Sequence, residues 1–131
     1  MTVVLDASAV LALVYDEPGA DRVAACVDGA VLSVANLAEV LAKHVDRGVD
    51  PEGVAWDLGA LGMRLEPVTS TDAQLQARVR SADLAAHDGR PKLSLGDRLC
   101  LATAWRLGLS TLTADDAWTD LDLPLEVTHI R

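Results

Sequence analysis

The chain has 131 residues, which fits one compact domain and leaves little room for a second. Half of the residues are hydrophobic, but the apolar runs fall well short of the roughly 20 residues that a membrane-spanning helix needs. With 20 acidic and 11 basic side chains, the net charge of −9 excludes the basic composition typical of nucleic-acid binders.

The acidic excess has two interpretations. It either forms a solvated surface that keeps a small protein in solution, or it includes carboxylates that bind metal cations. Cys26 and Cys100 form no CxxC motif and give no zinc signature, so we interpret them as small buried side chains. The N-terminus lacks the basic region of a secretory signal. We therefore expect a soluble, cytoplasmic protein.

The first part of the chain alternates strand and helix patterns. Short β-branched runs predict buried strands, and apolar side chains at a spacing of three or four residues predict helices. In chain order we expect a strand at residues 2–5, helices at 7–15 and 20–27, a strand at 31–34 and a helix at about 37–47.

The second part continues the alternation. We expect a helix with Pro51 in its first turn that ends near Gly62, a strand at 65–68, a helix capped by Ser70 or Thr71 that reaches about Ala86, a helix from Ser94 to Gly108, and strands at 110–113 and 125–130. Strands that alternate with helices predict a sheet covered on both faces. The expected fold class is α/β, a three-layer α/β/α arrangement with a mostly parallel central sheet, in one domain over residues 1–131.

Acidic side chains recur where predicted strands end and helices begin. Asp6 follows the first strand, Glu39 is expected in the first turn of the helix after the second strand, and Asp97 in the first turn of the helix from Ser94. The pair at 115–116 follows the strand at 110–113. In open α/β sheets, ligands bind at this edge of the sheet.

Each of these acids also has a structural interpretation. Asp6 suits a helix N-cap, the spacings Asn36-x-x-Glu39 and Ser94-x-x-Asp97 resemble capping boxes, and a turn accommodates either acid at 115–116. If the sheet brings the acids together, however, like charges must take up protons or bind a cation. Oxygen ligands favour Mg²⁺ or Mn²⁺ over zinc.

Four sequence blocks together resemble a PIN domain, and more narrowly a VapC-type toxin. The blocks are VVLDASAV, SVANLAEVL, LSLGDRLCLATAWRLG and LSTLTADDAW, in order and at ordinary spacing. The resemblance places the acidic metal-binding centre on Asp6, Glu39, Asp97 and Asp115. It assigns Ser8, Thr113 and Asp116 to groups that support the site. Which of the two adjacent acids points inward stays open, although the spacing to Trp118, where Phe is usual, favours Asp115.

The resemblance implies a Mg²⁺-dependent endoribonuclease, with Mn²⁺ as an alternative ion, that inhibits translation. It also implies a homodimer silenced by a VapB-like antitoxin in a type II toxin–antitoxin system, with no membrane association. RNA contacts are expected from Arg90, Lys92 and Arg98, basic side chains near the last acidic helix, although all three also suit a solvated surface.

Three other classes compete with this interpretation. An aspartyl-nucleophile phosphotransferase needs a second Asp two residues after the first, where this chain has Ser8. A response-receiver domain needs an early acidic pair and a late Lys, which the sequence lacks. The third alternative is a catalytically inactive PIN-like module that binds RNA or protein. The occupation of all four acidic positions argues against such decay.

Overall fold

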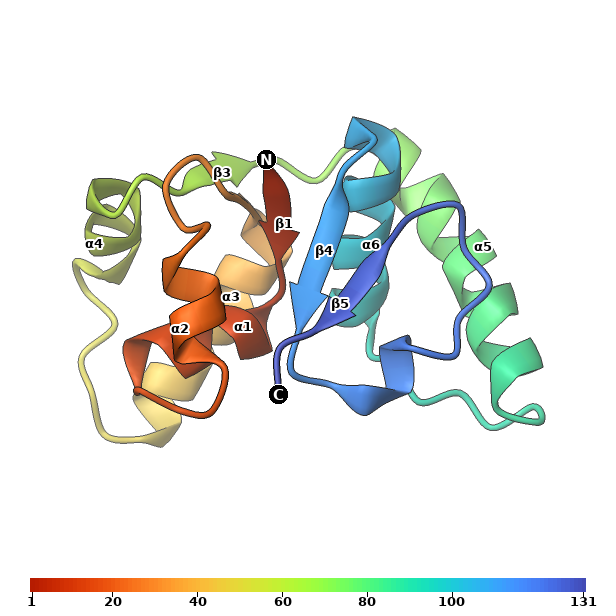
Figure 1. The fold of residues 1–131 in the computed structure, drawn as a ribbon, viewed down its shortest axis with the longest axis horizontal. Helices are drawn as coiled ribbons and strands as arrows, with labels where there is room; N and C mark the ends of the chain where they lie inside the picture. The colour runs from red at the N-terminus through yellow and green to blue at the C-terminus, as the bar shows by residue number, and fades with distance from the viewer.

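The computed structural model describes residues 1–131 and contains a five-stranded sheet between helical layers (Figure 1). The strand order is β3-β2-β1-β4-β5, and every neighbouring pair is parallel. The elements are β1 (Val3–Leu5), α1 (Ala7–Val14), α2 (Ala20–Ala24), β2 (Val31–Ser33), α3 (Val34–Asp46), α4 (Val54–Ala60), β3 (Arg64–Glu66), α5 (Ser70–Ala86), α6 (Leu95–Leu107), β4 (Ser110–Thr113), the 3-10 helix η1 (Asp116–Trp118) and β5 (Val127–His129). The predicted α/β class is confirmed, with a sheet that is wholly parallel.

The two faces of the central strands bury different sets of side chains. Val3, Leu5 and Leu32 pack with residues of α1, α2, α3 and α4 in one core cluster. Val4 and Val31, whose side chains alternate with these along β1 and β2, pack with residues of α5, α6 and η1 in the other. Helices therefore cover both faces of the sheet. None of them is long and apolar enough to cross a membrane.

Three predicted helix starts differ from the structure. Helix α5 is capped by Thr69 rather than by Ser70 or Thr71. Helix α3 begins at Val34 rather than near Leu37, because Ser33, the last residue of β2, caps it by accepting a hydrogen bond from the Ala35 N–H. The predicted capping box at Asn36-x-x-Glu39 is therefore wrong, and Glu39 lies in the second helical turn. Helix α4 begins after Gly53, so Pro51 lies in the preceding turn rather than in the helix.

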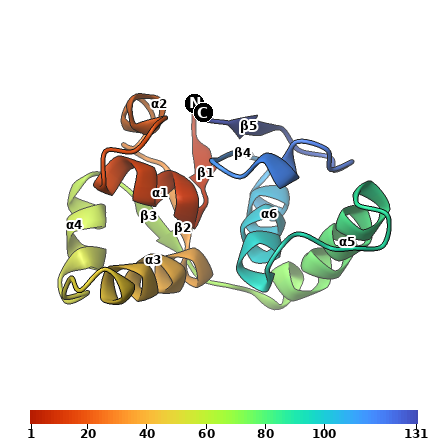
Figure 2. The ribbon, with the colours of Figure 1, turned by 90° about the horizontal axis from the view of Figure 1, so that it is seen from below.

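The strand order places a topological switch point between β1 and β4. From β1 the chain moves outward to β2 and β3, then crosses back to β4 on the other side of β1. Connections from the carboxyl ends of these two strands therefore diverge, which leaves room for a ligand. Asp6 directly follows β1, and Thr113 ends β4. Figure 2 views the molecule from this end of the sheet.

Candidate active site

Asp6 is buried at the boundary between β1, β4 and α1. Its side chain caps α1 by accepting a hydrogen bond from the Ala9 N–H at 2.8 Å, and it accepts another from the Thr113 hydroxyl at 2.6 Å. The Ser8 hydroxyl contacts both carboxylate oxygens, at 2.7 and 2.9 Å. Burial raises the Asp6 pKa to about 6 and outweighs the opposing effect of these hydrogen bonds. The charged form of Asp6 is thus held in a fixed place at a cost to the fold.

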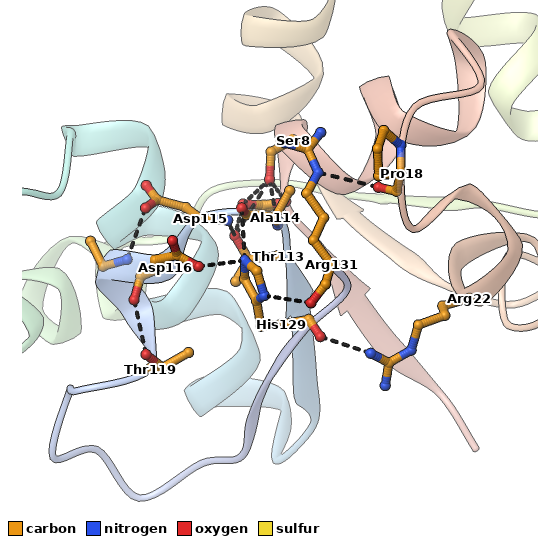
Figure 3. A network of polar contacts seen from close by, with 12 residues as sticks. Ser8, Pro18, Arg22, Thr113, Ala114, Asp115, Asp116, Thr119, His129 and Arg131 are labelled. Atoms are coloured by element: carbon orange, nitrogen blue, oxygen red, sulfur yellow. Dashed lines mark hydrogen bonds and ion pairs between the residues drawn. The ribbon is translucent and has the colours of Figure 1, made fainter.

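The two hydroxyl groups around Asp6 also fix the loop that follows β4. Thr113 Oγ1 accepts the Asp115 N–H at 3.0 Å, and Ser8 Oγ accepts the Ala114 N–H at 2.9 Å. Figure 3 shows these contacts converging where β4 ends. Ser8 and Thr113 therefore connect Asp6 with the segment that carries Asp115.

Glu39 reaches the same region from α3 and contacts the start of α6. Its Oε1 accepts a hydrogen bond from Asn36 Nδ2 at 2.8 Å, and the same amide donates to the Gly96 carbonyl at 3.1 Å. A Cβ on Gly96 would lie 2.6 Å from Glu39 Cδ and closer still to Oε1. Burial raises the Glu39 pKa, and the charge of Asp97 acts in the same direction. Asn36 and Gly96 thus position Glu39.

Asp97 forms the predicted capping box of α6. Its Oδ2 accepts the Ser94 N–H at 3.0 Å, while Ser94 Oγ accepts the Asp97 N–H at 3.1 Å. Burial raises the Asp97 pKa, and the charge of Asp115 raises it further. The charge of Asp97 in turn contributes to the raised pKa values of Asp6 and Glu39. The four predicted acids therefore share one electrostatic environment.

The adjacent acids at 115–116 have different surroundings. Asp115 is partly buried and caps η1 by accepting the Ala117 N–H at 2.9 Å. Asp116 has a side chain that is 92% exposed and pairs with His129 Nε2 at 2.8 Å (Figure 3). Asp115 is therefore the acid that faces Asp97.

A hollow of about 400 Å³ lies beside Asp115. Arg131 lines it and donates a hydrogen bond from Nε to the Pro18 carbonyl at 3.2 Å, as Figure 3 shows. Arg131 was not predicted as a site residue, because it lies outside the acidic sequence blocks. The other lining residues are Ser8, Leu11, Glu17, Ala114 and Asp116.

The acidic side chains lack a cationic partner. None of the ion pairs in the structure includes Asp6, Glu39, Asp97 or Asp115. As the side chains stand, no three His, Cys, Asp or Glu residues lie close enough together to hold a metal ion. Glu39, Asp97 and Asp115 each retain one carboxylate oxygen without a hydrogen bond. A set of carboxylate oxygens that takes part in no ion pair fits a hard divalent cation, although these side chains would have to turn to coordinate it.

The three predicted RNA-binding residues are placed differently. Arg98 donates from Nε to Gln76 Oε1 at 2.9 Å and from Nη1 to the Leu93 carbonyl at 3.1 Å, so its guanidinium is engaged within the protein. Arg90 and Lys92 are exposed on the segment between α5 and α6. Only these two are free to contact a ligand.

A family model for the PIN domain matches residues 3–123 of the chain. The chain belongs to the PIN-domain family. No curated protein matches it in a sequence comparison.

Similar solved structures come from bacterial toxin–antitoxin systems. One is VapBC2 from Rickettsia felis bound to a promoter DNA fragment, with a TM-score of 0.73 at 12% identity over 98% of both chains. Another is VapBC-5 from Mycobacterium tuberculosis, with a TM-score of 0.58 at 26% identity over 99% of this chain and 98% of that one. A third is M. tuberculosis VapC20, described as a sarcin–ricin loop cleaving toxin, with a TM-score of 0.59 at 23% identity over 87% and 90%.

In the absence of a divalent cation, Asp6→Asn should stabilise the fold at alkaline pH. The pKa of Asp6 is about 6 in the fold against its usual 3.8, so the folded protein binds this proton more tightly than the unfolded chain. The resulting stability is complete below the usual pKa and is lost as pH rises through about 6. The pKa difference between the folded and unfolded states corresponds to at most about 3 kcal/mol of stability. Urea denaturation of the parent and of the Asp6→Asn variant, in EDTA at about pH 5 and about pH 8, measures how the free energy of unfolding depends on this proton.

The matched control is Asp122→Asn, an exposed acid without polar partners. It should change the free energy of unfolding by less than about 0.5 kcal/mol at either pH. A metal-free Asp6→Asn protein that is less stable than the parent at alkaline pH would contradict the assigned cost of burying this charge.

Gly96→Ala should disturb Glu39 while leaving the fold intact, because the new Cβ meets the mobile end of that side chain. We expect a 10- to 100-fold loss of divalent-cation affinity, about the cost of removing a group that orients a metal ligand. Calorimetric titration with Mn²⁺ measures the loss, and circular dichroism checks the fold. Gly59→Ala is the control, because a Cβ at this helical glycine meets nothing within 4 Å. Equal Mn²⁺ affinity in both variants would contradict the role of Gly96 in positioning Glu39.

Proposed function

We propose that this PIN-domain chain is a Mg²⁺- or Mn²⁺-dependent endoribonuclease and the toxin of a type II toxin–antitoxin pair. The observation that carries the proposal is the electrostatic coupling of four acids at the switch point of a parallel sheet: the charge of Asp97 raises the pKa values of Asp6 and Glu39, and the charge of Asp115 raises that of Asp97. None of the four acids takes part in an ion pair. Mutual repulsion and burial disfavour the charged forms of Asp6, Glu39 and Asp97, and a bound divalent cation would relieve both effects.

We assign each residue of the site a role according to its surroundings. Asp6, Glu39 and Asp97 are the principal ligands, and Asp115 binds a further ion or acts through water. When bound, such an ion supplies the positive charge that activates a water molecule and stabilises the leaving oxygen of the phosphodiester. Ser8 and Thr113 hold the Asp6 carboxylate in one orientation, as their hydrogen bonds indicate.

A covalent route through sulfur is disfavoured by the structure. Cys100 is the thiol nearest in sequence to Asp97, but it is fully buried in the core. Burial raises its pKa well above the usual value, and the neighbouring charge of Asp6 adds to the effect. The thiol therefore stays protonated, and water is the nucleophile that we propose.

The partners follow from the same family. VapBC-5 is described as a member of a family of toxin–antitoxin systems, a similar structure from Klebsiella pneumoniae as a toxin–antitoxin complex, and VapC20 as a toxin that cleaves the sarcin–ricin loop. For this chain we propose an RNA substrate whose cleavage inhibits translation, a VapB-like antitoxin, a homodimer and a cytoplasmic location. A net charge of −9 suits a basic antitoxin segment at the acidic edge.

Asp97→Asn should abolish RNA cleavage and keep the fold, because Asn retains an oxygen acceptor for the Ser94 N–H. We expect kcat/KM to fall about 100-fold or more, since a misplaced cation removes several kcal/mol of transition-state stabilisation. The assay incubates the protein with total RNA in Mg²⁺ or in EDTA. If the parent leaves RNA intact in Mg²⁺ while binding it, the chain is an inactive binding module instead.

The adjacent acids provide a second test. Asp115→Asn should reduce cleavage far more than Asp116→Asn, because Asp115 faces Asp97 and Asp116 points to solvent. Asp122→Asn is again the unaffected control. The reverse order of the two losses would assign the inward role to Asp116.

A further inference from the structure

A buried carboxylate outside the acidic site anchors the segment between α5 and α6. The Asp83 side chain is fully buried and accepts the N–H groups of Lys92 and Leu93, both at 3.0 Å. His87 Nδ1 lies 2.7 Å from the same carboxylate. Burial acts to raise the Asp83 pKa, but the hydrogen bonds from Lys92, Leu93 and His87 outweigh it and lower the pKa. Asp83 therefore stays ionised and ties this segment to the last turn of α5.

The anchored segment presents two cations at the edge of a pocket. Arg90 and Lys92 are exposed, and their side chains take part in none of the ion pairs or hydrogen bonds of the structure. The pocket has a volume of about 580 Å³, within the usual range for small-molecule sites. Its lining residues are Ala86, His87, Asp88, Arg90, Lys92 and Asp120, and we call it the flanking pocket.

The flanking pocket lies at the same end of the sheet as the acidic site. Helix α6 starts at this end with Asp97 in its first turn, so the segment that leads into it lies there too. Asp120 comes from the loop after η1, which follows the carboxyl end of β4. Figure 2 shows both segments on this side of the molecule. Lys92 and Asp97 are five residues apart, so their backbones are separated by at most about 17 Å.

We propose that the flanking pocket binds a phosphodiester of the RNA strand away from the bond that is cut, with Arg90 and Lys92 as the phosphate ligands and Asp83 as a positioning residue. The inference rests on the proposed nuclease function. The acidic site repels the RNA backbone, so a polyanion needs a cationic contact elsewhere on this edge. Asp88 and Asp120 supply acceptors that match the ribose 2′-hydroxyl of RNA.

Salt dependence of binding tests the phosphate ligands. In an Asp97→Asn background, which keeps the RNA uncut, Arg90→Ala/Lys92→Ala is compared with Arg64→Ala/Arg80→Ala. The control pair removes the same charge from exposed positions on β3 and α5. Fluorescence anisotropy with a mixed-sequence single-stranded RNA gives log Kd against log salt concentration. We expect the slope to fall by about 1.4 for the pocket pair, at about 0.7 per lost phosphate contact, and to change little for the control.

The outcomes separate this inference from the proposed function. Equal slopes for the two double variants, in a protein whose Asp97-containing parent cleaves RNA, overturn the flanking pocket and leave the nuclease standing. A parent that neither binds nor cleaves RNA overturns both.

Asp83→Asn tests the positioning role, because it keeps both cations and weakens the anchor of the segment. When Asp83→Asn is the only substitution, so that Asp97 is present, we expect KM for RNA to rise several-fold while kcat stays unchanged. This pattern indicates the loss of a contact that binds substrate and transition state equally. A fall in kcat with unchanged KM contradicts the positioning role. If circular dichroism shows that this variant is unfolded, the comparison of the two double variants decides the proposal.

Discussion

The structure depends on burying a carboxylate at the end of its central strand. Asp6 donates its own N–H to the Leu112 carbonyl at 3.3 Å, which continues the pairing of β1 with β4, and its side chain caps α1. Two hydroxyl groups complete its contacts, one from α1 and one from β4. One residue therefore takes part in strand pairing through its backbone N–H, and in helix initiation and the proposed metal site through its side chain.

The same burial explains why charge is distributed unevenly over the molecule. Asp6, Glu39 and Asp97 have raised pKa values and no ion pair, whereas the buried acids Asp72 and Asp83 have lowered pKa values and dedicated partners. Asp72 is the clearest contrast, because burial raises its pKa but hydrogen bonds from Arg106 and from the Thr69 N–H bring it below the usual value. The fold can thus neutralise a buried carboxylate. The acids at the switch point have no such partner, which is consistent with the cation that we propose there.

Local signals in the sequence were sufficient for most of the architecture. The strand before Asp6, the capping box at Ser94 and the end of α6 at Gly108 all appear in the structure as predicted. The start of α3 was missed because Ser33 both ends a strand and caps a helix, while Asn36 and Glu39 happen to stand at capping-box spacing. A local pattern predicts the start of a helix well when no second capping pattern lies nearby in the sequence.

The missed residues share a different cause. Asn36 meets Gly96 across 60 positions of the chain, and Asp83 reaches backbone groups nine and ten positions away. No periodicity marks such contacts. Arg98 was predicted to contact RNA because it stands beside an acidic residue, and in the structure its guanidinium donates hydrogen bonds to Gln76 and to the Leu93 carbonyl. Tertiary contacts decided each of these cases.

Helix capping and metal binding are alternative roles for the acidic side chains when only the sequence is considered. In the structure the two roles are compatible. A carboxylate has two oxygens, and a helix cap uses one of them. Asp97 gives Oδ2 to the Ser94 N–H and Asp115 gives Oδ1 to the Ala117 N–H, so each keeps its second oxygen for a cation. The cap also fixes the side chain, which reduces the entropy lost when an ion binds. Helix starts at the carboxyl edge of this parallel sheet thus present oriented carboxylate oxygens, which suits the cation site that we propose.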